Sequence, residues 1–119
     1  MKQNLIQTRT FDFAVDIINL YKQMVEKNEY VLSKQLLRSG TSIGANVNEA
    51  ICAESKKDFV HKLSIALKEA RETKYWINIL KDSDYLSQDL FDYLNNLSTE
   101  IIKILSSIIL TTKQKYLKD

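Results

Sequence analysis

The chain has 119 residues, enough for one domain with a continuous hydrophobic core. Proline is absent and only two glycines occur, which disfavours β-sandwiches and barrels, because their many tight corners need both residues. The net charge of +2, from 17 basic and 15 acidic residues, is too small by itself to indicate a dedicated electrostatic nucleic-acid binder.

Several simple features bear on location and domain organisation. The single cysteine, Cys52, excludes an intramolecular disulfide and fits a reducing compartment. The first ten residues lack the apolar run of a signal peptide, and no stretch approaches the ~20 apolar residues that span a bilayer. We therefore expect a soluble, cytoplasmic protein with no membrane partner, and one domain over residues 1–119.

Apolar periodicity predicts four helices, over approximately residues 10–27, 31–53, 55–82 and 87–113. The first has one apolar face with spacings of four, three and four residues. This face consists of Phe13, Ile17, Leu20 and Met24. A flanking apolar stripe consists of Phe11, Val15, Ile18 and Val25.

Capping residues support the boundaries of the later helices. Ser55, with Asp58 three residues on, is typical of a helix start, and Ser87 can cap the last helix. Residues 113–119 are expected to fray. Because short connections favour antiparallel neighbours, the sequence predicts an all-α, up-down-up-down four-helix bundle.

The segment from Gly40 to Gly44 matches the G-x-S-x-G pattern of a nucleophile elbow. That elbow needs a preceding strand and a later acid and histidine, whereas this segment is helix-periodic. His61 is the only histidine, and with Cys52 it makes no zinc-type ligand cluster. The sequence therefore predicts a protein that is not an enzyme and has no catalytic residue, cofactor or metal.

The outer side of the second helix is unusual for a solvated surface. Arg38, Ser42, Ala45 and Glu49 recur at i, i+4, i+7 and i+11, opposite the leucine face. Small residues there let a neighbour approach, and Trp76 lies off the core face of the third helix. We expect contacts between subunits of a homo-oligomer. In the alternative interpretation, Trp76 is half-exposed and Arg38 is solvated.

Two carboxylates are candidate partners of Arg38. Glu69 and Glu72 can meet its guanidinium in two-pronged geometry, within one chain or between chains. On the outward side of the third helix, basic residues accompany them. These residues are Lys57, Lys68, Arg71 and Lys74. They form either a solvated charged face or a surface that contacts the phosphates of a nucleic acid.

The paired motifs at residues 35–50, 58–59 and 63–76 are specific. The first is QLLRSGTSIGANVNEA and the last is LSIALKEARETKYW. With them, almost the whole chain resembles the bacterial four-helix-bundle proteins known as 23S ribosomal RNA intervening-sequence proteins. It is also similar to the accessory variability protein of diversity-generating retroelements.

This resemblance implies a small antiparallel bundle that assembles into a ring, as a homopentamer. The family's genes lie in insertions within large-subunit ribosomal RNA genes. Binding of nucleic acid and of a reverse transcriptase is ascribed to the pentameric relative. None of the positions that match the family motif is catalytic. These positions are Arg38, Asn46, Glu49, Lys68, Glu69, Glu72, Tyr75 and Trp76.

Two functional hypotheses follow. The first is an oligomeric protein that binds RNA or a ribonucleoprotein, through a weak basic patch that symmetry repeats. The alternative is a structural or adaptor protein that binds another protein through its ring surface.

Overall fold

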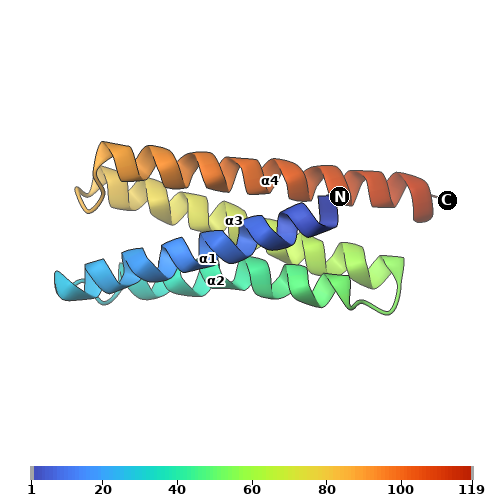
Figure 1. The fold of residues 1–119 in the computed structure, drawn as a ribbon, viewed down its shortest axis with the longest axis horizontal. Helices are drawn as coiled ribbons and strands as arrows, with labels where there is room; N and C mark the ends of the chain where they lie inside the picture. Colours follow the sequence, from blue (N-terminus) through green and yellow to red (C-terminus); the bar gives the residue numbers. More distant parts are fainter. Residues whose placement is uncertain (1, 119) are drawn as a thin grey trace.

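The computed structural model describes residues 2–118, with side chains described from residue 5 onward. It contains helices α1 (Lys2–Glu26), α2 (Leu32–Ile51), α3 (Lys56–Asp82) and α4 (Gln88–Tyr116). Figure 1 shows that they alternate in direction, with the α1–α2 and α3–α4 connections at one end and the α2–α3 connection at the other. The predicted all-α fold is confirmed, in an up-down-up-down arrangement about 50 × 22 × 22 Å in extent.

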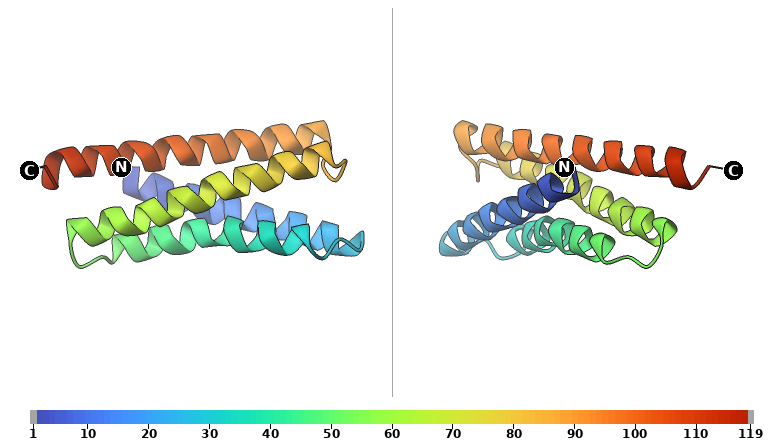
Figure 2. Two further views of the ribbon diagram at one scale, coloured as in Figure 1. Left: turned by 180° about the vertical axis from the view of Figure 1, so that it is seen from behind. Right: turned by 45° about the vertical axis from the view of Figure 1, so that its right-hand side comes forward.

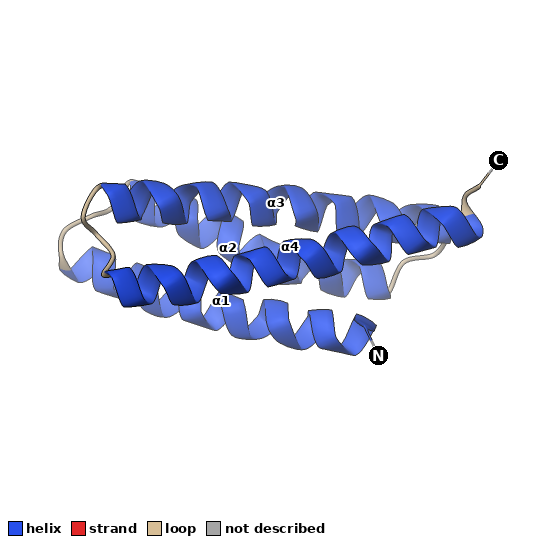
Figure 3. Cartoon of the chain, turned by 90° about the horizontal axis from the view of Figure 1, so that it is seen from above, coloured by secondary structure: helices blue, strands red, loops and turns tan. Residues whose placement is uncertain are grey.

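The helices form a four-membered ring in cross-section. Each packs on two neighbours: α1 and α3 both contact α2 and α4. Figures 2 and 3 show this arrangement from three further directions. The α1–α4 contact is the least extensive and includes an Arg9–Glu100 ion pair of 3.0 Å and a 2.9 Å hydrogen bond from the Tyr93 hydroxyl to Asp16. No helix within residues 2–118 is long and apolar enough to cross a membrane.

The prediction for the start of the first helix was wrong. Helix α1 begins at Lys2, not near Thr10, because its buried face continues through Thr10 and Ile6 at the same spacing of four and three residues. Thr10 tolerates burial because its hydroxyl lies 2.8 Å from the Ile6 carbonyl oxygen, one helical turn earlier. A threonine at this position hid the periodicity from sequence inspection.

The expected fraying of residues 113–119 was also partly wrong, because α4 continues to Tyr116. Thr112 is buried, and the ring of Tyr116 lies 4.6 Å from the Lys56 ammonium at the start of α3. This cation–π contact holds the last turn of α4 against α3. The predicted caps are confirmed, since Ser55 accepts from the Asp58 amide and Ser87 from the Leu90 amide.

Helix α2 begins on an unusual cap. Val31 provides no side-chain cap, and the buried carboxylate of Glu29 instead accepts from the backbone amides of Val31, Leu32 and Ser33 at 2.6–3.3 Å. These amides lie at the positive end of the helix dipole, where a carboxylate is stabilising.

The two glycines of α2 face α1. A Cβ at Gly40 would lie 2.8 Å from Cγ2 of the buried Ile17, whereas a Cβ at Gly44 would make contacts of 3.4 Å with Thr10. Gly40 is thus required for the close approach of α2 to α1. Gly44 only permits one.

This difference gives a paired stability test. We expect Gly44→Ala to raise the free energy of unfolding by up to about 1 kcal/mol, since alanine favours helix. Gly40→Ala should lower it by up to about 2 kcal/mol, because overpacking against Ile17 outweighs that gain. Urea denaturation followed by circular dichroism measures both. Equal stabilisation by the two substitutions would contradict the tight contact at Gly40.

Candidate nucleic-acid interface and polar network

A polar network joins the outer sides of α2 and α3. The guanidinium of Arg38 donates to the carboxylates of Glu69, at 3.2 Å, and Glu72. The indole Nε1 of Trp76 donates to the same Glu72 oxygen at 3.1 Å. Of the pairings that the sequence left open, the structure thus shows the one within a chain. The half-buried Trp76 also packs against the core.

Charge and hydrogen bonding tune this network. The indole donor of Trp76, followed by the Arg38 guanidinium, lowers the pKa of Glu72 below its ordinary value. The hydrogen bond with Glu72 in turn raises the pKa of Arg38. Both shifts favour the ionised pair. The hydrogen-bond donors stabilise the Glu72 carboxylate more than the neutral acid, and the carboxylate in turn stabilises the charged guanidinium of Arg38.

The other residues predicted at a subunit interface line the same side of α2. Ser42 donates to the Ser39 carbonyl and Asn46 to the Ser42 carbonyl, while Glu49 pairs with Lys62 of α3 at 3.2 Å. Ala45 is exposed among them. These polar groups therefore have partners within one chain. The small side chain of Ala45 lies between longer ones.

Ser42 lies in the middle of α2, and not in a strand-to-helix turn. His61 is exposed on α3, and the part of the chain that the structure describes holds no group of three or more potential metal ligands. The G-x-S-x-G match is therefore part of a packing surface.

The four predicted basic residues follow the outer side of α3. Lys57, Lys68 and Arg71 are exposed, and their spacings of eleven and three residues place them within about 60° of one another around the helix. Lys74 turns toward α4, where its ammonium donates to the Thr99 hydroxyl at 2.8 Å. The four residues thus extend from the exposed side of α3 to its contact with α4.

Two residues of α4 extend this surface, and the sequence analysis missed them. Lys103 and Lys113 follow Thr99 by four and fourteen residues, which places both on the side of α4 where Thr99 meets Lys74. Finding them needed the pairing of the two helices, which no local pattern reveals. We call this surface the basic face. It consists of Lys57, Lys68, Arg71, Lys74, Lys103 and Lys113.

Nearby carboxylates point elsewhere. Glu69 and Glu72 bind Arg38 on the α2 side of α3, and Glu100 binds Arg9 on the α1 side of α4. Three acids close in sequence to Lys68, Arg71 and Lys103 are thus paired with arginines at the edges of the basic face.

A second exposed surface lies on α1. Phe11 is 66% exposed, and Val15 and Ile18 continue its line at i+4 and i+7. These three residues belong to the flanking apolar stripe that the sequence indicated, and the structure leaves them exposed. We call them the apolar strip. Beside it a surface groove of about 540 Å³ is lined by residues of both α1 and α2.

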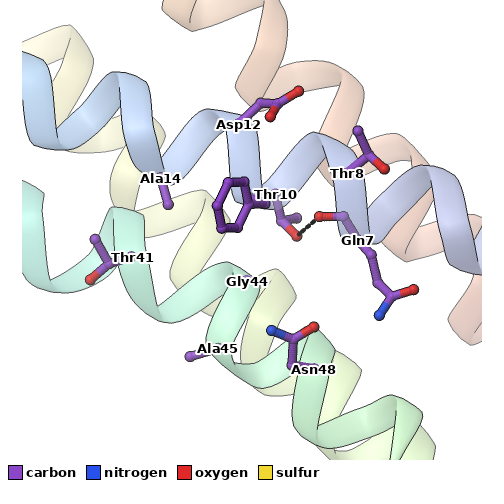
Figure 4. Close-up of a pocket in the computed structure, with 10 residues that line it drawn as sticks. Gln7, Thr8, Thr10, Asp12, Ala14, Thr41, Gly44, Ala45 and Asn48 are labelled. Carbon is purple, nitrogen blue, oxygen red and sulfur yellow. Dashed lines mark hydrogen bonds between the residues drawn. The ribbon is translucent and has the colours of Figure 1, made fainter.

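Figure 4 shows the groove, with Gly44, Ala45 and Asn48 of α2 facing Gln7, Thr10 and Ala14 of α1. Its α2 wall is low because Gly44 and Ala45 are small. Ala45 therefore lies between two surfaces, the groove on one side and the polar network on the other.

Comparison with known proteins identifies the family of this chain. The family model described as 23S rRNA-intervening sequence protein matches residues 2–107. The chain belongs to this family.

A solved structure of the same kind is similar throughout. It is the 1.70 Å crystal structure of a protein with unknown function from the S23 ribosomal protein family, from Bacteroides thetaiotaomicron. It is 54% identical, has a TM-score of 0.90, and the alignment covers 92% of this chain and 98% of that chain. No curated protein matches the chain.

The network provides a pH test. Because the folded pKa of Glu72 is lowered, its contribution to stability is present above the ordinary glutamate pKa of about 4.3 and is lost as pH falls through the lowered value. We expect the fluorescence of Trp76, the single tryptophan, to change in that acid range. Glu72→Gln should abolish this step. A step that persists unchanged in Glu72→Gln would assign the titration to another group.

Proposed function

We propose that this protein is a non-enzymatic, oligomeric RNA-binding protein that contacts phosphates through its basic face. The observation that carries the proposal is the row of exposed cations along α3. Lys57, Lys68 and Arg71 are exposed within about 60° of one another around the helix, while the neighbouring carboxylates of Glu69 and Glu72 are paired with Arg38. The family name, which refers to an intervening sequence of 23S ribosomal RNA, supports RNA as the partner.

The modest net charge is compatible with this function if binding is multivalent. A few Lys and Arg contacts give one subunit only weak, salt-sensitive affinity for phosphates. A closed oligomer repeats the same surface, so that each further contact forms at a high effective concentration. The proposal therefore includes self-assembly, for which a ring-shaped homopentamer is the expectation from the resemblance.

The exposed surfaces suggest how a ring closes. A cyclic ring joins one surface of each subunit to a different surface of the next. The apolar strip on α1 is one candidate, because an exposed Phe11 flanked by Val15 and Ile18 gains from burial. The outer side of α2 and α3 around Ala45 is the other candidate. The basic face, between α3 and α4, stays open in this arrangement.

The second candidate function is an adaptor that binds another protein. The observation that favours it is the same apolar strip, which a different partner can cover if no second copy does. The two functions differ in their salt dependence and in the oligomeric state of the purified protein.

The RNA proposal is tested by fluorescence anisotropy with a labelled RNA hairpin that carries a loop, titrated over a range of salt. We expect log affinity to fall linearly with log salt. Lys68→Gln/Arg71→Gln should weaken binding and flatten the slope by about 1 for each phosphate that the variant no longer neutralises.

The matched control is Lys22→Gln/Lys34→Gln, which removes two exposed positive charges from α1 and α2, outside the basic face. We expect a much smaller effect. Absence of binding at about 50 mM salt would reject RNA as the partner, and an equal decrease in affinity for both variants would reject the basic face.

Assembly has its own test. Because Ala45 is exposed in the subunit, Ala45→Arg should keep the helical circular dichroism of the wild type. A charged side chain at a close subunit contact is destabilising, so we expect the oligomer to dissociate. Multi-angle light scattering measures the mass of both proteins. A wild-type monomer at micromolar concentration would contradict the ring and favour the adaptor.

A further inference from the structure

An exposed aromatic side chain, Tyr75, lies beside the α3 residues of the basic face. Tyr75 is 58% exposed, the largest exposed fraction among the exposed tyrosines of the described chain. It follows Arg71 by four residues and Lys68 by seven, so the three side chains share one line along the helix. From Lys57 to Tyr75 this line is about 27 Å long.

The ring of Tyr75 is held in place by the polar network. It meets the Trp76 ring edge to face, with centroids 5.2 Å apart and planes inclined by 69°. Trp76 is itself fixed by its hydrogen bond to Glu72 and by packing on the core. An exposed ring with an anchored neighbour loses less conformational entropy when it receives a flat ligand.

We infer that the RNA bound by this face presents unpaired nucleotides, and that Tyr75 stacks on one of their bases. This inference rests on the proposed function and names its substrate class. Stacking needs a base whose face is open, which the interior of a duplex does not offer. Positive residues that follow the backbone, combined with an aromatic platform, are the recurring chemistry of single-strand binding.

The other exposed tyrosines are less suited to stacking. The ring of Tyr116 is already covered by the ammonium groups of Lys56 and Lys115, at 4.6 and 5.3 Å. The hydroxyl of Tyr93 donates to Asp16, and this carboxylate raises the pKa of Tyr93. Tyr30 lies in the α1–α2 connection, away from the basic face. Tyr75 combines an exposed ring with neighbouring positive charge.

The test compares two labelled RNAs of about twelve nucleotides, a uridine-rich single strand and a blunt duplex, by anisotropy at one salt concentration. We expect the wild type to prefer the single strand. Tyr75→Ala should weaken single-strand binding roughly 5- to 100-fold, a range that corresponds to the removal of one stacked base. Its affinity for the duplex should not change, and Tyr75→Phe should bind both RNAs like the wild type.

The control variant is Tyr30→Ala, which removes a ring of similar exposure far from the basic face. Circular dichroism of each variant confirms the fold, and quenching of Trp76 by the single strand alone gives a second readout beside Tyr75. If Tyr75→Ala binds the single strand like the wild type, or weakens both RNAs equally, stacking is wrong while RNA binding stands. If neither RNA binds the wild type, the inference and the proposed function both fail.

Discussion

The contact between Gly40 of α2 and Ile17 of α1 constrains much of this bundle. Because Gly40 has no side chain, α2 lies directly against the buried Ile17. Beside this contact, on the α3 side, the buried hydroxyl of Ser39 lies 2.9 Å from that of Thr73. Arg38 comes next on the exterior and reaches both carboxylates of α3. This close contact thus sets how closely α2 packs against α1, and it thereby sets the position of the polar network.

The network of Arg38, Glu69 and Glu72 affects the distribution of surface charge more than it affects stability. Exposed ion pairs contribute little to stability, and Arg38 is largely exposed. Its effect is on the charge of the surface, since it pairs with both Glu69 and Glu72. These are the two carboxylates next to Lys68 and Arg71, whose own side chains stay exposed beside Tyr75. A nearly neutral protein thereby acquires a positive surface with an aromatic ring at one end.

The three exposed surfaces have different chemistry, and this difference argues for different partners. The apolar strip on α1 gains from the exclusion of water, the small-residue surface of α2 accepts close packing, and the basic face gains from phosphate contacts. In the proposed assembly, the first two surfaces form the contacts between subunits and the basic face stays open. In the proposed function, the repetition of a weak site by symmetry compensates for the small net charge of +2.

The sequence by itself determined the four helices, their alternating direction and most of their boundaries, because apolar periodicity and the serine caps at Ser55 and Ser87 are local signals. It failed at the start of α1, where the buried Thr10 satisfies its hydroxyl within its own helix and breaks the apolar pattern. It also identified Arg38, Glu69 and Glu72 as candidate partners, since their charges and their positions on the helices can be read from the sequence.

Only the tertiary structure decided the relations between helices. It showed that Arg38 pairs within its own chain, that the stripe at Phe11 is exposed, and that Lys103 and Lys113 join the basic residues of α3. It also assigned Gly40 to a required contact and Gly44 to a permitted one. Each of these depends on the depth and rotation of one helix against another, which side-chain packing over the whole core sets and no single stretch of sequence encodes.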